Sequence, residues 1–209
     1  NHVSARLVED QLNDAEQSHG SLDGSYVLFS EFGTPGTAMA NGSSAYSLHF
    51  DGSSRDYVQL PNDLLDGMEN VTVEFWVRST DINKPINTVF HATHTGGNDF
   101  SIEFKADQIT VLTQYGTATA NVTHQNHQWY HVAVVRQGET LRVYENGYLI
   151  GEGTLTSSAA LNIEGAVVLG QEQDSIGGGF EATQALEGQL DELRIWKTAR
   201  SLAAGSLCL

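Results

Sequence analysis

The sequence lacks the residues that crosslink a chain. Cys208 is the only cysteine among 209 residues, so neither a disulfide framework nor a four-cysteine zinc site can form within the chain. No apolar run approaches the ~18 residues that a membrane-spanning helix needs, so we predict no membrane span. A chain of this length can bury about 70% of its unfolded surface in one core, and a single domain therefore needs no crosslink.

Basic residues are also scarce. The chain has 10 Lys and Arg against 26 Asp and Glu, a formal net charge of −16 at pH 7. Nucleic acid binding requires clustered Lys and Arg, so this balance speaks against a nucleic acid partner. A surplus of carboxylates suits divalent cations, or solubility in a salty medium. The chain begins without Met or a leader segment, and we interpret it as a fragment or a mature segment.

Short alternating runs rich in Val, Ile, Thr, Tyr and Phe predict strands over most of the chain. Asn146-Gly147, between 141–145 and 148–150, is the strongest hairpin signal. No helical stretch separates the runs, so we predict an all-β fold, an antiparallel sandwich of two sheets. The expected strands are residues 46–50, 57–60, 71–77, 88–91, 100–104, 109–113, 129–136, 140–145, 167–169 and 189–196.

The two ends of the chain have a different texture. Ser4–Gln17 has apolar residues at rough helical spacing and predicts a short N-terminal helix, and Tyr26–Phe29 predicts an early strand. We divide the chain into an N-terminal extension packed on the same domain (1–44), the sandwich (45–200) and a C-terminal tail (201–209).

Residues 171–184 stand out chemically. They hold three carboxylates and three side-chain amides around the glycines at 177–179. Ca²⁺ takes about six to eight oxygen ligands of these types at about 2.3–2.6 Å. Glu172 and Asp174 point the same way in extended backbone, and the flexible glycines would let Glu181 and Gln184 reach the same ion.

The charges also suit a metal site. Asp99, from the oxygen-rich turn 96–99, joins Glu172, Asp174 and Glu181 to make four negative charges, which match two Ca²⁺ ions. Without metal, carboxylates at close range repel one another and raise each other's pKa. Composition alone leaves open the alternative of a solvated acidic loop.

Residues 169–184 resemble the calcium loop of the pentraxins, Ca²⁺-dependent pattern-recognition proteins with a concanavalin-A-like jelly-roll fold. The resemblance covers about residues 45–200, where further segments resemble the broader laminin-G-like superfamily. It implies a two-sheet antiparallel jelly-roll β-sandwich. The further segments are Phe50–Gly52, Val71–Val77, Trp129–Ala133 and Leu190–Trp196.

The resemblance also implies a ligand set for two Ca²⁺ ions. Gln173 would contribute its backbone carbonyl, and Glu172 and Asp174 would bridge the ions. The family's Asp-Asn pair from an earlier loop stands here in reversed order. The implied metal ligands are Asn98, Asp99, Glu172, Gln173, Asp174, Glu181 and Gln184.

In pentraxins the exposed side of the ions binds phosphate or carboxylate groups, including phosphocholine and acidic saccharides. Phe104 falls where some members have an aromatic beside the ligand, but it fits a core position of the strand 100–104 equally well. The residues that match the animal family's intradomain disulfide are Glu74 and Ala133, so that bridge is absent. The loops 113–121 and 154–162 are rich in small residues and do not identify a ligand.

We therefore expect a non-enzymatic, lectin-like module of an extracellular or cell-surface adhesin, with neighbouring domains in a larger, bacterial chain. It would recognise a saccharide or a phosphorylated or carboxylated headgroup through calcium. The first alternative is a spacer module that calcium rigidifies and that binds no ligand.

The remote alternative is a polysaccharide hydrolase or lyase. A retaining glucanase needs two carboxylates about 5–5.5 Å apart. The only acidic strand of that kind is 187–192, where strict alternation would place Asp191 and Glu192 on opposite faces. We found no other catalytic motif.

Two histidine pairs have three-residue spacing, His91 with His94 and His124 with His127. Both lie on expected strand ends and loops and not on one helix face. We interpret them as surface or hydrogen-bonded residues and not as zinc ligands.

Overall fold

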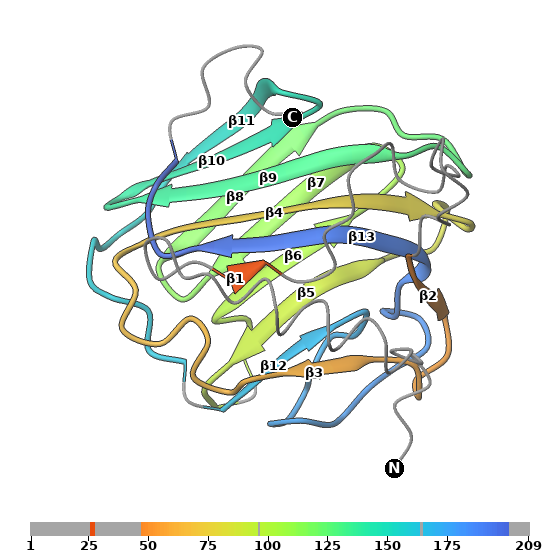
Figure 1. Ribbon diagram of the computed structural model, residues 1–209, viewed down its shortest axis with the longest axis horizontal. Coiled ribbons are helices and arrows are strands. Elements are labelled where there is room, and N and C mark those ends of the chain that lie inside the picture. The colour runs from red at the N-terminus through yellow and green to blue at the C-terminus, as the bar shows by residue number, and fades with distance from the viewer. Residues whose placement is uncertain (1–25, 28–46, 96, 164, 201–209) are drawn as a thin grey trace, which may run out of the picture.

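The computed structural model describes residues 26–27, 47–95, 97–163 and 165–200 (Figure 1). The predicted helix at 4–17 and residues 28–29 of the early strand lie outside this part of the chain. No helix within it is long and apolar enough to cross a membrane. The described residues form β1 (Tyr26–Val27), β2 (Leu48–Asp51), β3 (Val58–Leu60), β4 (Asn70–Ser79), β5 (Thr88–Thr93), β6 (Phe100–Phe104), β7 (Gln108–Thr113), β8 (Gly116–Asn121), β9 (Tyr130–Gln137), β10 (Thr140–Glu145), β11 (Tyr148–Thr154), β12 (Ala166–Leu169) and β13 (Glu187–Trp196).

These strands form two antiparallel sheets that lie one behind the other in Figure 1. One sheet has the order β1-β13-β4-β9-β10-β11, with β2 also paired to β13. The other has the order β3-β12-β5-β6-β7-β8. Several neighbours in the sheets are distant in sequence, as in β13 beside β4 and β12 beside β5, whereas β5 to β8 and β9 to β11 are consecutive. The predicted all-β, two-sheet jelly-roll sandwich is confirmed.

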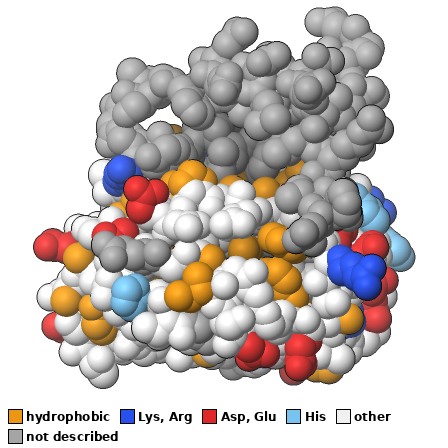
Figure 2. Space-filling model, turned by 90° about the horizontal axis from the view of Figure 1, so that it is seen from below, with side chains coloured by type: hydrophobic (Ala, Val, Ile, Leu, Met, Phe, Trp, Pro, Cys, Tyr) orange, Lys and Arg blue, Asp and Glu red, His pale blue; other side chains and the backbone are white. Residues whose placement is uncertain are grey.

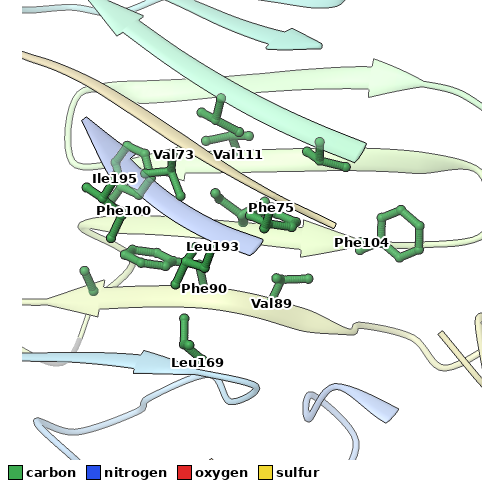
Figure 3. Close-up of a cluster of buried hydrophobic side chains, with 14 of the residues drawn as sticks. Val73, Phe75, Val89, Phe90, Phe100, Phe104, Val111, Leu169, Leu193 and Ile195 are labelled. Atoms are coloured by element: carbon green, nitrogen blue, oxygen red, sulfur yellow. The ribbon is translucent and has the colours of Figure 1, made fainter. Parts of the chain in front are cut away.

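Alternating side chains from both sheets fill the space between them. Phe75 and Leu193 come from one sheet and Phe90, Phe100 and Leu169 from the other, and Figure 3 shows them within one cluster. All five are fully buried. Burying a side chain of this size stabilises the fold by about 1.5–3 kcal/mol, so this core accounts for stability without crosslinks.

Phe104 belongs to the same core. It is 1% exposed, and its ring centroid lies 4.1 Å from that of His124 and 5.7 Å from that of Tyr130. The structure therefore assigns Phe104 to the core and not to a ligand surface.

Strand β8 contradicts the prediction of a loop at 113–121. The segment is rich in Gly, Ala and Thr, which is unusual for a strand. The reason is tertiary: a Cβ on Gly151 of β11 would lie 2.8 Å from the Cβ of Ala120, and one on Gly153 2.9 Å from that of Ala118. The two sheets meet at this edge, and only small residues allow so close an approach.

A bulge interrupts β13 and corrects a second prediction. The register with β4 shifts between Asp191 and Arg194, and Glu192 has a positive φ of 49°. Leu190 and Leu193, three residues apart, both lie in the core. Alternation therefore breaks between them. Our inference that Asp191 and Glu192 occupy opposite faces assumed strict alternation along this strand, and that assumption was wrong.

Noncovalent contacts occupy the positions that match the disulfide of the animal family. Glu74 and Ala133 are direct partners across β4 and β9. Glu74 Oε1 accepts a hydrogen bond from Trp196 Nε1 at 2.9 Å, which links β4 to β13. Strand pairing and this side-chain bond connect the region where animal pentraxins have a covalent bridge.

Gly170, directly after β12, offers a test of the packing. Its φ is +81°, and a Cβ there would lie 2.4 Å from the Phe50 ring. We expect Gly170→Ala to cost about 1–2 kcal/mol for the left-handed backbone and about 1–3 kcal/mol more for the clash. Gly67→Ala is the control, because Gly67 has a φ of +71° but open space around it. Equal losses in denaturant unfolding would contradict the packing argument.

Candidate functional site

The acidic loop, residues 171–184, leaves β12 and returns to the place where it began. Gly170 N donates to Val89 O, Thr88 N to Gln184 O, and Leu186 N to Gly170 O. These bonds hold both ends of the loop against the start of β5. The fold thus brings Glu172 and Gln184, twelve positions apart, to one end of the sheet.

The middle of the loop is a tight turn. Ser175 and Gly178 exchange two backbone hydrogen bonds, of 3.2 and 2.9 Å. Ile176 at the tip is 56% exposed, and Gly177 beside it has a positive φ of 66°. The glycines serve this turn, as their flexibility led us to expect.

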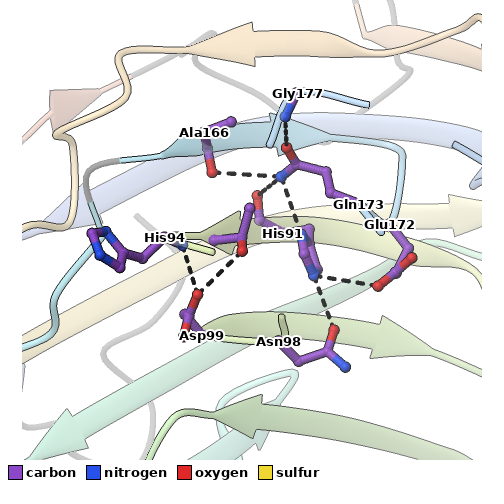
Figure 4. A network of polar contacts seen from close by, with 9 residues as sticks. His91, His94, Asn98, Asp99, Ala166, Glu172, Gln173 and Gly177 are labelled. Carbon is purple, nitrogen blue, oxygen red and sulfur yellow. Dashed lines mark hydrogen bonds and ion pairs between the residues drawn. The ribbon is translucent and has the colours of Figure 1, made fainter. Parts of the chain in front are cut away.

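His91, wholly buried on β5, lies at the centre of the polar network in Figure 4. Gln173 Nε2 lies 3.1 Å from its Nδ1. Since an amide nitrogen donates, Nδ1 accepts and Nε2 carries the hydrogen. Nε2 then donates to Asn98 Oδ1 at 2.9 Å and lies 3.6 Å from Glu172 Oε1. Burial lowers the pKa of His91, which favours this neutral form.

His91 thus joins three of the seven predicted ligand residues from two separate loops. The side chain of Gln173 is engaged elsewhere, because its Oε1 accepts from Gly177 N at 2.9 Å and its Nε2 also donates to His91 O. The structure thus gives the Gln173 side chain a role in holding the loop, and its backbone carbonyl stays the predicted ligand.

The other predicted ligands differ in how they are held. Asp99 Oδ2 accepts from Thr93 Oγ1 at 3.1 Å and from His94 N at 2.6 Å, which ties it to the end of β5. Asp174 and Glu181 are exposed on the acidic loop. Within the part of the chain that the structure describes, no three carboxylate, imidazole or thiol groups converge on one point. A metal would therefore need amide and carbonyl oxygens, or movement of the exposed carboxylates.

Two buried oxygens of the acidic loop fit a cation. Glu172 Oε2 and Gln184 Oε1 have no hydrogen-bond donor among the described residues. Burial raises the pKa of Glu172 to about 7, and the negative charges of Asp174, Glu103 and Glu181 add to the effect. A buried acceptor without a donor costs about 1–3 kcal/mol, which a bound cation would offset. The donor set of carboxylates and amides is the type that Ca²⁺ uses.

The sequence did not predict that the negative charge of Glu103 helps to raise the pKa of Glu172. Glu103 alternates with the core residues Ile102 and Phe104 on β6, so it lies on the outer side of the sheet. Lys105 Nζ lies 2.6 Å from its Oε2. This alternation was visible in the sequence, but nothing there indicated that the strand passes near Glu172.

In the second histidine pair, His124 is buried and hydrogen-bonded, as interpreted. His124 Nε2 lies 2.6 Å from Glu145 Oε2, and His124 Nδ1 lies 2.5 Å from Lys105 O. His127 is exposed.

Comparison with known proteins places this geometry in a family. A family model described as the concanavalin A-like lectin/glucanases superfamily matches residues 51–204. The chain belongs to this superfamily. Its relatives agree with the pentraxin and laminin-G-like resemblance: C-reactive protein 1.1 of Limulus polyphemus is 28% identical over 142 residues, 64% of this chain and 59% of that protein. Human neuronal pentraxin-1 is 32% identical over 149 residues, 68% of this chain but 34% of that protein. The chain thus spans less than two thirds of these relatives.

Solved structures agree with this fold. A heptameric SAP-like pentraxin from Limulus polyphemus superposes with a TM-score of 0.57 at 27% identity, over 66% of this chain and 68% of that one. A Ruminococcus gnavus sialidase CBM40 bound to α2,3 sialyllactose has a TM-score of 0.59 at 14% identity, over 74% and 91%. Domain 4 of the arabinanase AbnA from Geobacillus stearothermophilus, in complex with arabinotriose, has a TM-score of 0.58 at 18% identity, over 85% and 84%. The last two show the shared fold alone.

Glu172 predicts a pH dependence in metal-free protein. Its pKa rises from 4.5 to about 7 on folding, so the native state binds this proton more tightly than the unfolded chain. Stability in chelator therefore falls as pH rises from 4.5 to about 7. We expect Glu172→Gln to weaken this dependence in melting curves, while Glu139→Gln, at an exposed position, leaves it unchanged. Parallel pH profiles for all three proteins would contradict the assignment.

Proposed function

We propose that this chain is a non-enzymatic recognition module that binds two Ca²⁺ ions at the acidic loop and uses them to bind a saccharide or an anionic headgroup. The observation that carries the proposal is the pair of buried, donorless oxygens, Glu172 Oε2 and Gln184 Oε1. The resemblance of 169–184 to the pentraxin calcium loop supports it. The proposed ligands are Asn98, Asp99, Glu172, Gln173, Asp174, Glu181 and Gln184.

The chain's own residues have separable roles in this proposal. His91 orients Asn98 and Glu172 through its Nε2, and the side chain of Gln173 anchors the loop to His91. Asp174 and Glu181 are exposed and able to close on an ion. A bound Ca²⁺ would supply positive charge and open coordination positions for phosphate, carboxylate or hydroxyl oxygens of a ligand.

On the described part of the face in Figure 2, Lys and Arg side chains are few and do not form a basic patch. Figure 2 shows the side of the molecule nearest β3 and β12, where acidic side chains lie around the rim and uncharged ones in the middle. An anionic ligand would be repelled by this surface at −16 overall charge unless cations mediate the contact. A neutral saccharide would meet no such barrier.

The comparisons support a saccharide as the ligand class. The CBM40 and AbnA domains of similar fold were solved with bound oligosaccharides. The pentraxin relatives favour an extracellular setting, and one is part of a much longer chain, the rat protein with sushi, von Willebrand factor type A, EGF and pentraxin domains. We accordingly infer an adhesin module with neighbouring domains.

A second candidate is a structural spacer in which calcium only rigidifies the loop. The burial of Glu172, Gln173 and the donorless oxygen of Gln184 favours it, because a metal held there would be partly enclosed by protein. The exposure of Asp174 and Glu181 favours recognition instead.

Asp174→Asn tests the metal site. We expect it to abolish tight calcium binding at the acidic loop in calorimetry, because it removes a bridging carboxylate. Wild type should lose stability on chelation, by about 2.7 kcal/mol relative to a hundredfold excess of calcium over Kd. Asp63→Asn, in an exposed turn, is the matched control and should keep both properties. An unchanged affinity of Asp174→Asn would remove the proposed site.

A glycan and phospholipid-headgroup array, probed with millimolar calcium and again with chelator, tests recognition. We expect binding only in calcium, and the bound class names the ligand. Silence in both conditions, from protein shown to hold calcium, would support the spacer. Binding that survives chelation would place recognition elsewhere on the sandwich.

A further inference from the structure

A buried contact joins the end of β12 to the loop between β2 and β3. Gln171 Nε2 donates to Ser53 O at 2.5 Å and to Asp56 O at 3.1 Å. Gln171 is wholly buried and Asp56 is 4% exposed. This contact lies on the β3 side of β12, whereas Gln173 reaches His91 on β5, the other neighbour of β12.

Each of these two side chains keeps one buried oxygen without a donor. Asp56 Oδ2 accepts from Asp51 N at 2.8 Å, but Asp56 Oδ1 has no partner among the described residues. Gln171 Oε1 has none either. The amide orientation is settled by the two carbonyls that its nitrogen faces. Buried oxygens without a donor are costly, so these two need a cation or a hydrogen-bond donor nearby.

We propose that Asp56 and Gln171 bind a hard, oxygen-preferring cation of the Ca²⁺ type, distinct from the ions of the acidic loop. The carboxylate and amide oxygens are ligands of the kind that Ca²⁺ takes. Asp51 and Ser53 lie in the same loop, and Asp51 Oδ1 accepts a hydrogen bond from Ser53 N at 2.8 Å. The Asp51 carboxylate, together with that of Asp56, would supply two negative charges, which match one divalent ion.

Among the described residues, no basic side chain is hydrogen-bonded to these two oxygens. Lys84 Nζ donates to Ala185 O at 2.7 Å and more weakly to Gly52 O at 3.4 Å. It thus bonds to backbone carbonyls and not to the two donorless oxygens. Burial raises the pKa of Asp56 and the charge of Asp51 adds to this, while the hydrogen bond from Asp51 N and the charge of His49 oppose it.

Two other partners would satisfy the same oxygens. Asp56 could carry a proton, or buried water could donate to the two oxygens. Neither depends on metal, so the number of bound ions separates them from the proposal.

The experiment counts Ca²⁺ ions by equilibrium dialysis of the full chain. We expect Asp56→Asn to bind one ion fewer than wild type and to lose part of the calcium-induced rise in Tm. Asn has the shape of Asp and keeps an oxygen that accepts from Asp51 N, so the metal-free fold is retained. Asp51→Asn keeps the bond to Ser53 N and should weaken the same ion, and Asp63→Asn is the exposed control. Unchanged ion number and Tm rise in both Asp56→Asn and Asp51→Asn would overturn the proposal.

Asp174→Asn separates this site from the acidic loop. If the two are independent, Asp174→Asn retains the ion that Asp56→Asn loses. Loss of an ion in Asp56→Asn but none in Asp174→Asn would remove the acidic-loop site and leave this one standing. Loss of an ion in Asp174→Asn but none in Asp56→Asn would overturn the proposal of a site at Asp56 and Gln171 and leave the acidic-loop site standing.

Discussion

Buried oxygen atoms without hydrogen-bond donors are the physical constraint around which this end of the sandwich is built. They lie on both sides of the segment after β12: Glu172 Oε2 and Gln184 Oε1 in the acidic loop, and Asp56 Oδ1 and Gln171 Oε1 toward β3. All four are acceptors. Each costs about 1–3 kcal/mol when it has no hydrogen-bond donor. A bound cation would offset this cost, and a chain rich in carboxylates attracts cations.

The sandwich supplies the rigid frame that makes this burial possible. Its core of interleaved aromatic and aliphatic residues, with Phe75 and Leu193 facing Phe90 and Phe100, holds β5 and β12 side by side. His91 on β5 then meets Asn98 from one loop and Glu172 and Gln173 from another. A neutral, buried imidazole suits this position, because it donates to the Asn98 amide oxygen and accepts from the Gln173 amide without adding charge.

Membership of the concanavalin A-like superfamily accounts for the scaffold but not for every detail of this chain. Where animal pentraxins have a disulfide, Glu74 and Ala133 face each other across β4 and β9, and Glu74 bonds to Trp196. At the far edge, Gly151 and Gly153 pack on Ala120 and Ala118, so the sheets close there by small residues. Stability thus rests on packing and strand pairing.

Strand prediction succeeded where side chains alternate strongly. β6 and β10 have the expected bounds, and most other strands differ by one to four residues. It failed at β8, because its small residues serve a contact with β11 that no local pattern reveals. It also failed at the β13 bulge, where Glu192 takes a left-handed conformation that breaks the alternation.

The sequence by itself determined the fold class, through alternating apolar residues, and the oxygen-rich chemistry of 171–184. Only the tertiary structure decided which of these oxygens are buried and which neighbours meet them. Glu103, His91 and Asp56 come from strands and loops far from the acidic loop in sequence, yet they contact or electrostatically affect its residues. Composition sets how many charges a chain carries, whereas burial and proximity set what each one costs, and those exist only in the folded chain.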